Sequence, residues 1–399
     1  MFIALTGKPS VGKSCFFKAA TLVEVEIHER PFTTLKSSEG IAYVKVDCVD
    51  KEFNVQCTPR EGYCINGKRF VPVKLMDIPG LIEGSHVGRG RGNQFLGDIA
   101  QADVLIHIID ISGSTNEKGE PVLPLSHDPL KDVKFLEKEI DLWFLSIVKK
   151  GWDKFAKTVR GENQNIKQAI AKQLSGLKVT EEIAEEAIKE LKLIHHPIEW
   201  TESDLEELSS VLRRKTKPML IAANKIDVEG AEYNFHRLKK AFPDILSIPC
   251  SAESELALKE AAKQKLIEYI PGEREFTILQ ENKLNEKQKK GLEFIKKNVL
   301  EKYGSTGMQE VLDKTVFDFL RYIAVFPVGN SKLEDSKGRC LPDCYLIKKG
   351  RTALDLAYKI HQDIGNNFIK AIDIKRKIVI GKDYQIKHME VIEIKTKYQ

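Results

Sequence analysis

The chain has 399 residues, of which 42% are hydrophobic and 30% are charged, and its formal net charge is +5 at pH 7. This length allows more than one domain, and the composition is ordinary for a globular protein. No apolar run approaches the roughly 18–20 residues of a membrane span, and the N-terminus lacks a secretory signal, so we expect a cytoplasmic protein with no membrane segment. The mild positive charge permits contact with RNA but does not demand it.

The first predicted element is a short apolar strand over residues 2–6, and a glycine-rich loop and a helix-compatible segment follow it. The loop matches the pattern G-x-x-x-x-G-K-[ST] through Gly7, Lys8, Pro9, Ser10, Val11, Gly12, Lys13 and Ser14, with Cys15 next. In this context the backbone N–H groups and the helix dipole face phosphates, Lys13 reaches the terminal phosphates, and the Ser14 hydroxyl ligates Mg²⁺. The alternative is a chance glycine-rich turn. The order of strand, loop and helix favours a nucleoside triphosphate site.

Cysteines gather around the next predicted strand, which covers residues 41–47. Cys48, Cys57 and Cys64 follow it closely, whereas Cys340 and Cys344 form a distant C-x₃-C pair. The odd total of seven argues against a disulfide framework. Either group could form a zinc clip, or all of these residues could be buried or surface thiols. Neither group has paired C-x₂-C spacing or a suitably spaced histidine, which favours the thiols.

The strand predicted over residues 70–77 ends in a D-x-x-G pattern, Asp77 to Gly80. An acid at this point can hold a metal ion through water, and the glycine N–H can sense a γ-phosphate. The next residue is Leu81, where Ras-like enzymes carry a glutamine that orients the attacking water. Because leucine cannot polarise water, we expect slow intrinsic hydrolysis unless a partner, a monovalent cation or another side chain contributes.

A base-reading motif follows a later strand. Strands are predicted over residues 103–110, 218–223 and 245–249, and the second of these leads into Asn224-Lys225-Ile226-Asp227. In N-K-x-D, the Asp227 carboxylate can accept two hydrogen bonds from guanine, whereas adenine offers neither donor and would leave the carboxylate unpaired. Asn224 and the stem of Lys225 would brace the base. The backbone N–H groups of Ser251, Ala252 and Glu253 suit the guanine O6 atom. The order of these elements along the chain predicts GTP rather than ATP.

Two stretches exceed what a minimal nucleotide-binding domain needs, and both are predicted to be helical. The first covers about residues 113–216, and within it Thr180 is expected to cap an amphipathic helix. The second covers about residues 254–303 and is broken at Pro271-Gly272. Its charge-dense part resembles a solvated helix face more than a nucleic-acid patch.

The character of the chain changes near residue 323. A strand, a turn and a helix capped by Thr352 are predicted, followed by strands near residues 368–374, 377–380 and 391–395. Residues 375–387 contain five cations and one acid. This segment suits contact with a phosphate backbone, and equally suits a lysine-protected hairpin edge.

Three segments resemble known families. The glycine-rich segment 77–96 resembles the second switch of Obg-like GTPases, and Pro31-Phe32-Thr33-Thr34-Leu35 resembles their first switch. The likeness is to the archaeal and fungal branch related to YchF. Residues 354–361 with 368–371 resemble the TGS domain, a ubiquitin-like β-grasp module that recurs in translation-linked proteins.

The resemblance implies an α/β fold: a P-loop GTPase domain over residues 1–325, with a mostly parallel sheet, helices on both faces and the two helical insertions, and a TGS domain over 326–399. It implies hydrolysis of GTP to GDP through Lys13, Thr34 and Gly80. It also implies Mg²⁺ held by Ser14, Thr34 and Asp77, with Thr33 as the alternative to Thr34. K⁺ remains an alternative cofactor, although Ser10 offers only one short hydroxyl where relatives commonly carry asparagine.

The same resemblance implies a slow molecular switch linked to the ribosome or to RNA through the TGS domain and the first insertion. The alternative is a nucleotide-tuned binding module for RNA or the ribosome, in which hydrolysis is incidental. Relatives that prefer ATP have lost the guanine-reading aspartate, whereas this chain keeps Asp227.

Overall fold

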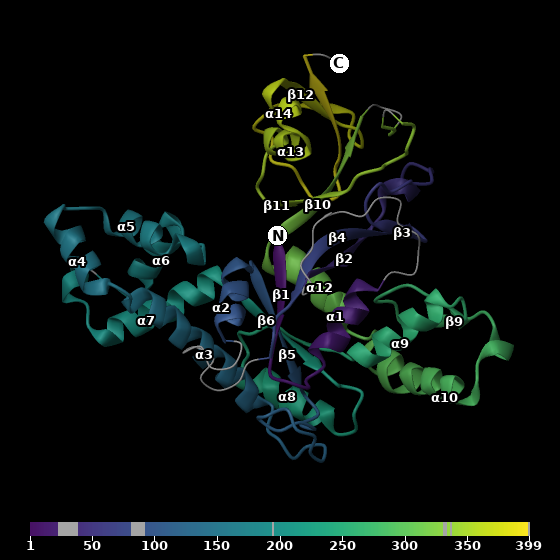
Figure 1. Cartoon of the computed structure of the whole chain (residues 1–399). Coiled ribbons are helices and arrows are strands. Elements are labelled where there is room, and N and C mark those ends of the chain that lie inside the picture. Colours follow the sequence, from purple (N-terminus) through teal and green to yellow (C-terminus); the bar gives the residue numbers. More distant parts are fainter. Residues whose placement is uncertain (23–38, 81–91, 194, 330–332, 336, 398–399) are drawn as a thin grey trace. The chain divides into compact units, whose positions relative to one another are not determined.

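The computed structural model describes residues 1–22, 39–80, 92–193, 195–329, 333–335 and 337–397. The chain separates into two compact units (Figure 1). The first comprises Met1–Ala19, Lys74–Leu256 and Gly291–Gly307, and the second comprises Ala20–Val73, Ala257–Lys290 and Met308–Gln399. Each unit is assembled from three stretches of sequence, so neither corresponds to one continuous fragment.

A parallel sheet forms the centre of the first unit. Its strands are β1 (Phe2–Thr6), the last residues of β4 (Lys68–Asp77), β5 (Val104–Asp110), β6 (Met219–Asn224) and β7 (Ser247–Pro249). They lie in the order β4-β1-β5-β6-β7, and each neighbouring pair is parallel. The chain builds one side of the sheet and then the other, so the strand order reverses at β1. Ligands bind beyond the carboxyl ends of parallel strands at such a point.

Helices and apolar side chains cover this sheet. The covering helices are α1 (Lys13–Thr21), α2 (Gly92–Gln101), α8 (Ala231–Ala241) and the start of α9 (Ala252–Lys263). Every residue of β5 is buried, as expected for a parallel strand covered on both faces. One apolar cluster contains Met76 and Leu105, and a separate one contains Ile221 and Phe235. The predicted α/β fold with a mostly parallel sheet is confirmed.

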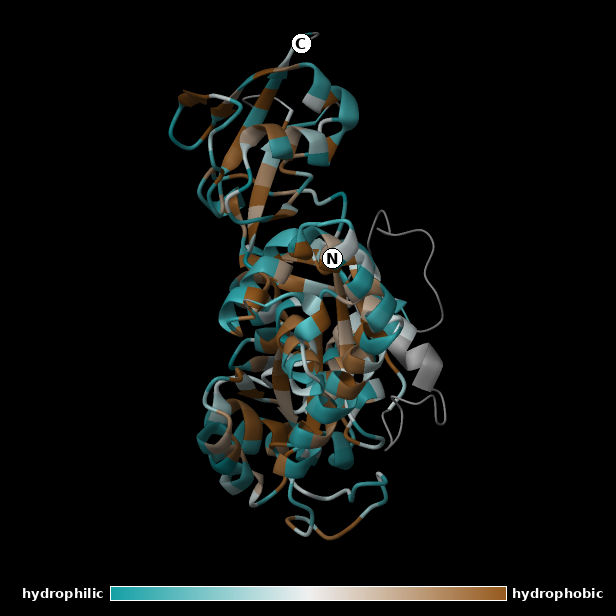
Figure 2. Cartoon of the chain, turned by 90° about the vertical axis from the view of Figure 1, so that its left-hand side faces the viewer, coloured by the Kyte–Doolittle hydropathy of each residue, from teal (hydrophilic) through white to brown (hydrophobic). Residues whose placement is uncertain are grey.

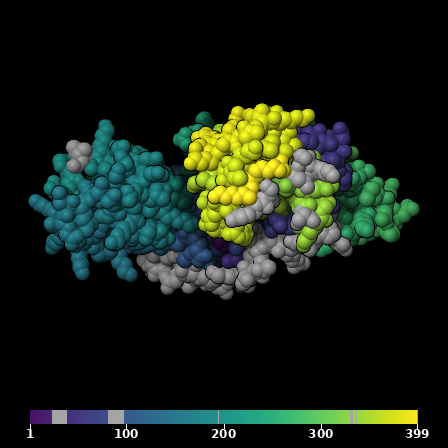
Figure 3. Space-filling model, turned by 90° about the horizontal axis from the view of Figure 1, so that it is seen from above, coloured from purple at the N-terminus to yellow at the C-terminus, as the bar shows by residue number. Residues whose placement is uncertain are grey.

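The first insertion is built of helices, and Figure 3 draws its atoms in teal. Its helices are α3 (Leu130–Lys149), α4 (Trp152–Gly161), α5 (Ile166–Gln173), α6 (Glu181–Glu190) and α7 (Glu202–Thr216). Trp152 and Trp200 stack with ring centroids 5.6 Å apart, and both belong to the apolar cluster that contains Met76 and Leu105 of the sheet. Thr180 caps α6, since its side chain accepts a hydrogen bond from the N–H of Ile183, as predicted.

The second unit begins with a short meander. β2 (Glu39–Asp47) neighbours β4, and β3 (Tyr63–Ile65) pairs antiparallel with the first residues of β4. Asn66 and Gly67 both have positive φ, of 48° and 75°, and form the tight turn between these two strands. Tyr63 and Phe70 then stack across the hairpin with ring centroids 4.5 Å apart. The pairing fixes the register of β3, including Cys64.

The second insertion differs from its prediction. It contains an antiparallel pair, β8 (Ile267–Tyr269) and β9 (Phe276–Ile278), in addition to α9, α10 (Glu286–Ile295) and a π-helical turn (Lys296–Leu300). The insertion is helical at both ends as predicted, but strands rather than helices flank Pro271-Gly272. Ile267 and Tyr269 are buried and the intervening Glu268 is exposed, which is the two-residue alternation of a strand. Three residues are too few for this alternation to stand out in a sequence.

A five-stranded sheet forms the C-terminal module. The order is β11-β10-β14-β12-β13, and only β10 and β14 pair in parallel. Its elements are β10 (Tyr322–Val328), β11 (Tyr345–Lys348), α13 (Ala353–Ile360), α14 (Gln362–Asn366), β12 (Phe368–Asp373), β13 (Ile378–Ile380) and β14 (Val391–Thr396). Thr352 and Asp355 form the expected capping box of α13. Figure 2 shows the strands of this module largely brown, which is the hydrophobic end of its scale.

The boundary predicted between residues 325 and 326 falls inside β10. Ile323 and Val325 belong to the same apolar cluster as Leu356 and Ile392 of the module. We therefore propose that the module begins at Tyr322.

Candidate functional site

The glycine-rich loop lies between β1 and α1, and two of its glycines are required by their surroundings. Gly7 has a φ of +146°, and a Cβ built on it would lie 2.3 Å from the carbonyl oxygen of Ile108. Gly12 has a φ of +98°, and a Cβ there would lie 2.3 Å from Nδ2 of Asn224. Any larger residue would therefore push the loop away from β5 or from the base-reading motif.

Lys13 and Gly80 converge on this loop. The Lys13 Nζ donates a hydrogen bond of 2.6 Å to the carbonyl oxygen of Lys8. Burial lowers the pKa of Lys13 to about 8, an effect that the negative charge of Asp77 partly opposes. A Cβ on Gly80 would lie 3.2 Å from the Lys13 Nζ and 3.1 Å from the backbone nitrogen of Pro9. The D-x-x-G glycine therefore lies against both the loop and its lysine.

Ser14 and Asp77 supply oxygen atoms that suit a magnesium ion. The Ser14 Oγ is 3.5 Å from Oδ2 of Asp77. The other carboxylate oxygen, Oδ1, is buried and has no hydrogen-bond partner among the described residues. Burial raises the pKa of Asp77 in spite of the nearby Lys13. Mg²⁺ prefers hard oxygen ligands, so this pair fits the ion. Thr33, Thr34 and Leu81, to which the sequence assigned roles, lie outside the described residues.

Asn224 connects three loops of the site. Its Nδ2 donates to the carbonyl oxygen of Val11 at 2.8 Å, and its Oδ1 accepts from the N–H of Ala252 at 2.9 Å. The Asn224 side chain thus ties the base-reading motif to the phosphate loop and to the S-A-E segment. Asp227 is half-buried, and in the described part of the chain its carboxylate takes part in no hydrogen bond.

Two of the three backbone N–H groups in the S-A-E segment already donate hydrogen bonds within the protein. The N–H of Ser251 donates to the carbonyl oxygen of Thr306 at 2.9 Å, and the N–H of Ala252 is held by Asn224. Both groups were expected to face guanine O6. Of the three predicted donors, Glu253 carries the remaining N–H, and a base contact at Ala252 would have to share the Asn224 bond.

Asp110 is a site residue that the motif search missed. It ends β5, is fully buried, and accepts a hydrogen bond from the Lys225 Nζ at 2.8 Å. The hydroxyl groups of Ser112, Ser114 and Thr115 also donate to its carboxylate. Burial works against the charged form, but the hydrogen bonds from Lys225 and these hydroxyls keep the pKa of Asp110 below its usual value. A single acid at the end of a strand that is apolar apart from His107 is the signal that could have identified it.

A second missed contact fixes the phosphate loop from outside. The Lys8 Nζ donates to the carbonyl oxygen of Thr115 at 2.8 Å and lies 2.8 Å from Oδ2 of Asp132. His127 bonds the other oxygen of Asp132, also at 2.8 Å. The protein therefore engages the Lys8 side chain, so Lys8 can face a phosphate only with its backbone. The loop before α3 and the first turn of α3 therefore brace the site.

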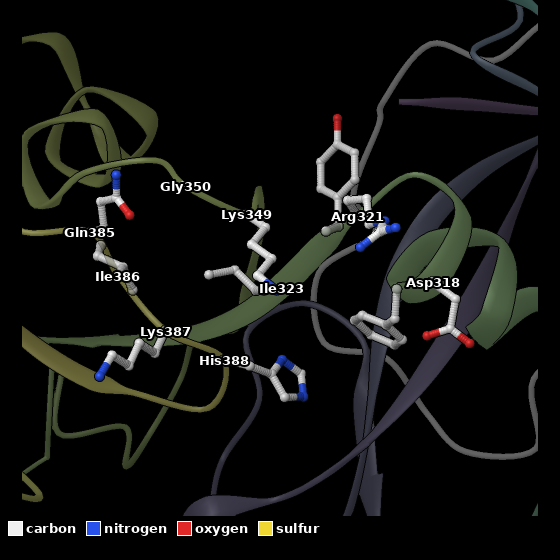
Figure 4. A pocket seen from close by; sticks show the side chains of 11 residues that line it. Asp318, Arg321, Ile323, Lys349, Gly350, Gln385, Ile386, Lys387 and His388 are labelled. Carbon is white, nitrogen blue, oxygen red and sulfur yellow. The ribbon is translucent and has the colours of Figure 1, made fainter. Parts of the chain in front are cut away.

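In the C-terminal module, the basic segment 375–387 is partly neutralised. Lys375 pairs with Glu52 at 2.8 Å, and Arg376 pairs with Asp373 and Glu390. Lys387 instead lines an open pocket that Arg321, Lys349 and His388 also border (Figure 4). Lys377 and Lys382 are exposed elsewhere on the segment, so the pocket gathers only part of its positive charge, and the acid Asp318 also lines the pocket.

The parallel sheet and the motifs at its carboxyl edge define a P-loop nucleotide-binding domain of the GTPase class. The family model for 50S ribosome-binding GTPases matches residues 2–143, and the model for the G4 motif-containing domain of YGR210-like Obg-like GTPases matches residues 222–330. The TGS domain model matches residues 332–396.

Known relatives extend over the whole chain. A GTP-binding protein of Methanocaldococcus jannaschii is 48% identical over 98% of each chain. The solved structure of a GTP-binding protein from Pyrococcus horikoshii has a TM-score of 0.79 and 37% identity, and the match covers 99% of this chain and 100% of that one. The ribosome-binding ATPase YchF of Mycoplasma pneumoniae is 24% identical over 92% of this chain and 87% of its own length. The chain belongs to the Obg-like GTPase family and carries a C-terminal TGS domain, as the sequence predicted. None of the described helices has both the length and the apolar composition needed to cross a bilayer.

Proposed function

We propose that this protein binds GTP and GDP in preference to adenine nucleotides, hydrolyses GTP slowly, and signals its nucleotide state to the ribosome or to an RNA. The observation that carries the proposal is the arrangement of Asn224, Lys225 and Asp227. Asn224 is bonded to the phosphate loop and Lys225 to Asp110, whereas the Asp227 carboxylate keeps its acceptors for a ligand. A carboxylate whose oxygen atoms can still accept hydrogen bonds, in a motif fixed by its neighbours, suits the two donors of guanine.

The phosphate side of the site supports binding and transfer of a terminal phosphoryl group. Lys13 would exchange the Lys8 carbonyl for phosphate oxygens, and the Gly80 N–H would respond to a γ-phosphate held by that lysine. Ser14, Asp77 and Thr34 would hold Mg²⁺, which neutralises charge on the phosphates when bound. Leu81 stands where a polar residue would orient water, so slow turnover is expected of the protein alone.

Single-turnover hydrolysis separates a switch from its alternative. The parent protein should convert bound GTP well below the usual enzyme range of about 1–10³ s⁻¹, and ribosomes should accelerate it. If ribosomes bind the protein and leave the rate unchanged, the alternative holds, in which hydrolysis is incidental to a nucleotide-tuned binding module. Hydrolysis at several turnovers per second without any partner would contradict the inference from Leu81.

The cationic pocket of the C-terminal module supports contact with RNA. Lys349 and Lys387 are exposed and reach the same pocket from different segments. Clustered cations bind a phosphate backbone even on a chain of modest net charge, and such binding weakens as salt rises. The first insertion is the other candidate surface.

Charge reversal distinguishes the two surfaces. The double variant Lys349→Glu, Lys387→Glu should reduce co-sedimentation with archaeal ribosomes by about tenfold or more at low salt, because each lost phosphate contact weakens binding. GDP affinity should remain at the parent level. The matched variant Lys154→Glu, Lys157→Glu reverses two exposed lysines of α4 and should have little effect. The opposite outcome would assign the partner to the first insertion.

A further inference from the structure

Four potential metal ligands meet beside β2 and β3. Cys48 follows the last residue of β2, and Asp50 belongs to the 3₁₀ turn that comes next. Cys57 lies in the irregular segment that follows, and Cys64 is the middle residue of β3. We refer to these four residues as the cysteine cluster. All of them belong to the second unit.

The distances within the cysteine cluster suit a tetrahedral ion. The Sγ atoms of Cys48 and Cys57 are 3.7 Å apart, and the Sγ of Cys64 is 3.9 Å from Oδ2 of Asp50. All four ligand atoms lie within 4.8 Å of one another. Zinc–sulfur bonds of about 2.3 Å in a tetrahedron place neighbouring sulfur atoms about 3.8 Å apart. A disulfide needs about 2.05 Å, so Cys48 and Cys57 are two free thiols.

Burial makes the cluster expensive without a cation. Cys48 and Cys57 are each 4% exposed and Asp50 is 3% exposed. Asp50 accepts a backbone hydrogen bond from Lys51, yet no lysine or arginine side chain in the described part of the chain forms a salt bridge with it. Buried carboxylates are normally paired with a cation or coordinate a metal ion. Three sulfur atoms around that carboxylate select a thiolate-preferring metal over Mg²⁺ or Ca²⁺.

We propose that Cys48, Asp50, Cys57 and Cys64 bind one Zn²⁺ as a closed structural site. Three thiolates and one carboxylate complete a tetrahedron, so no coordination position remains open for a substrate. Zinc binding to such a set contributes directly to folding, because the unfolded chain does not hold the ligands together.

The segment between Cys57 and Cys64, which the ion would fix, contacts the chain just before β11. Between Cys57 and Cys64, the N–H groups of Thr58 and Arg60 donate to the carbonyl oxygens of Cys340 and Pro342, at 2.8 and 2.9 Å. Arg60 also forms a salt bridge of 2.9 Å with Asp343. The loop that the cysteines enclose therefore holds the strand-free segment that leads into β11. We infer that the metal stabilises the attachment of the C-terminal module within the second unit.

Metal content of the full-length protein tests the proposal. After expression with zinc and purification without chelators, the parent should retain about one Zn²⁺ per chain. The Co²⁺-substituted protein should show the intense visible d–d bands of a tetrahedral site and a sulfur-to-cobalt charge-transfer band. Cys64→Ser removes the least buried sulfur of the cluster and should lower zinc affinity by at least about tenfold, and Asp50→Asn should shift the cobalt spectrum.

Cys344→Ser is the matched control, since this cysteine belongs to the same unit but not to the cluster. It should keep the zinc content of the parent. GDP binding, measured in each variant, reports separately on the nucleotide site and verifies that the first unit is folded. The proposal is overturned if parent protein that binds GDP holds no zinc and gives no tetrahedral cobalt spectrum, or if Cys64→Ser and Cys344→Ser retain equal amounts of metal.

Discussion

The nucleotide site and the cysteine cluster both gather polar groups from separate parts of the chain, but they differ in how the chain encodes them. In the nucleotide site, the strand register brings the groups together: Asp77 pairs with Leu5 next to the phosphate loop, and Asp110 pairs with Asn224. Asp77 and Asn224 also belong to short motifs, because phosphate and base contacts depend on a particular backbone geometry, whereas Asp110 belongs to none. The cysteine cluster uses only side chains, which a strand end, a turn, a loop and a neighbouring strand supply. Its ligands come from four separate places in the chain, without the paired spacing of common zinc motifs, so the sequence shows no motif for it.

The largest effect is expected at the centre of the motif-encoded site. Lys13→Ala removes the charge that stabilises the transferring phosphoryl group and should lower single-turnover GTP hydrolysis by at least about 10²–10³-fold. Lys172→Ala, at an exposed position of α5, should retain the parent rate. An unchanged rate of GTP hydrolysis in Lys13→Ala would contradict the comparison, because the motif would then not identify the site of hydrolysis.

A smaller effect is expected at Asp110, which belongs to the same site but to no motif. Asp110→Asn should leave the Lys225 ammonium without its buried anionic partner and lower GDP affinity by about 10–100-fold, or about 1.4–2.8 kcal/mol. The control is Asp153→Asn at an exposed position of α4. Unchanged affinity in an equilibrium titration of Asp110→Asn would mean that the motif alone is sufficient.

The third effect concerns a carboxylate of the second unit that no motif predicts. Asp313 accepts hydrogen bonds from the N–H of Lys45 and from Gln309, both through Oδ1, at 2.7 and 2.8 Å. Burial raises the pKa of Asp313 to about 7. The folded protein thus binds this proton more tightly than the unfolded chain, so the contribution to stability is present at low pH and is lost as the pH rises from about 4 to about 7.

Asparagine can keep both hydrogen bonds of Asp313 through its own Oδ1 and cannot ionise. Asp313→Asn should therefore flatten the fall in unfolding free energy over this pH range and stabilise the protein at pH 8 by at least about 1 kcal/mol, as measured by urea denaturation. Asp318→Asn, at an exposed position nearby, should leave the pH profile as it is in the parent. If the unfolding free energy falls with pH equally in both variants, a group other than Asp313 is responsible for the fall.

What the sequence could predict follows the same division. The phosphate loop, the N-K-x-D motif and the capping residues Thr180 and Thr352 depend on local backbone geometry. Their short sequence patterns are therefore sufficient to predict them. The strands β8 and β9 are too short to show a pattern, so the sequence predicts helix in their segment. The contacts of Lys8 with Asp132 and of Lys225 with Asp110 join residues more than one hundred positions apart, and only the folded sheet brings them together.

The central claim is that this site reads guanine, and competitive equilibrium binding of GDP and ADP tests it most directly. Asp227 should make GDP bind at least about tenfold more tightly than ADP, a difference of about 1.4 kcal/mol or more. Asp227→Asn should abolish most of this preference and retain the phosphate contacts of Lys13, whereas Asp244→Asn, outside the site, should keep the preference. Equal affinity of the parent protein for GDP and ADP would contradict the account.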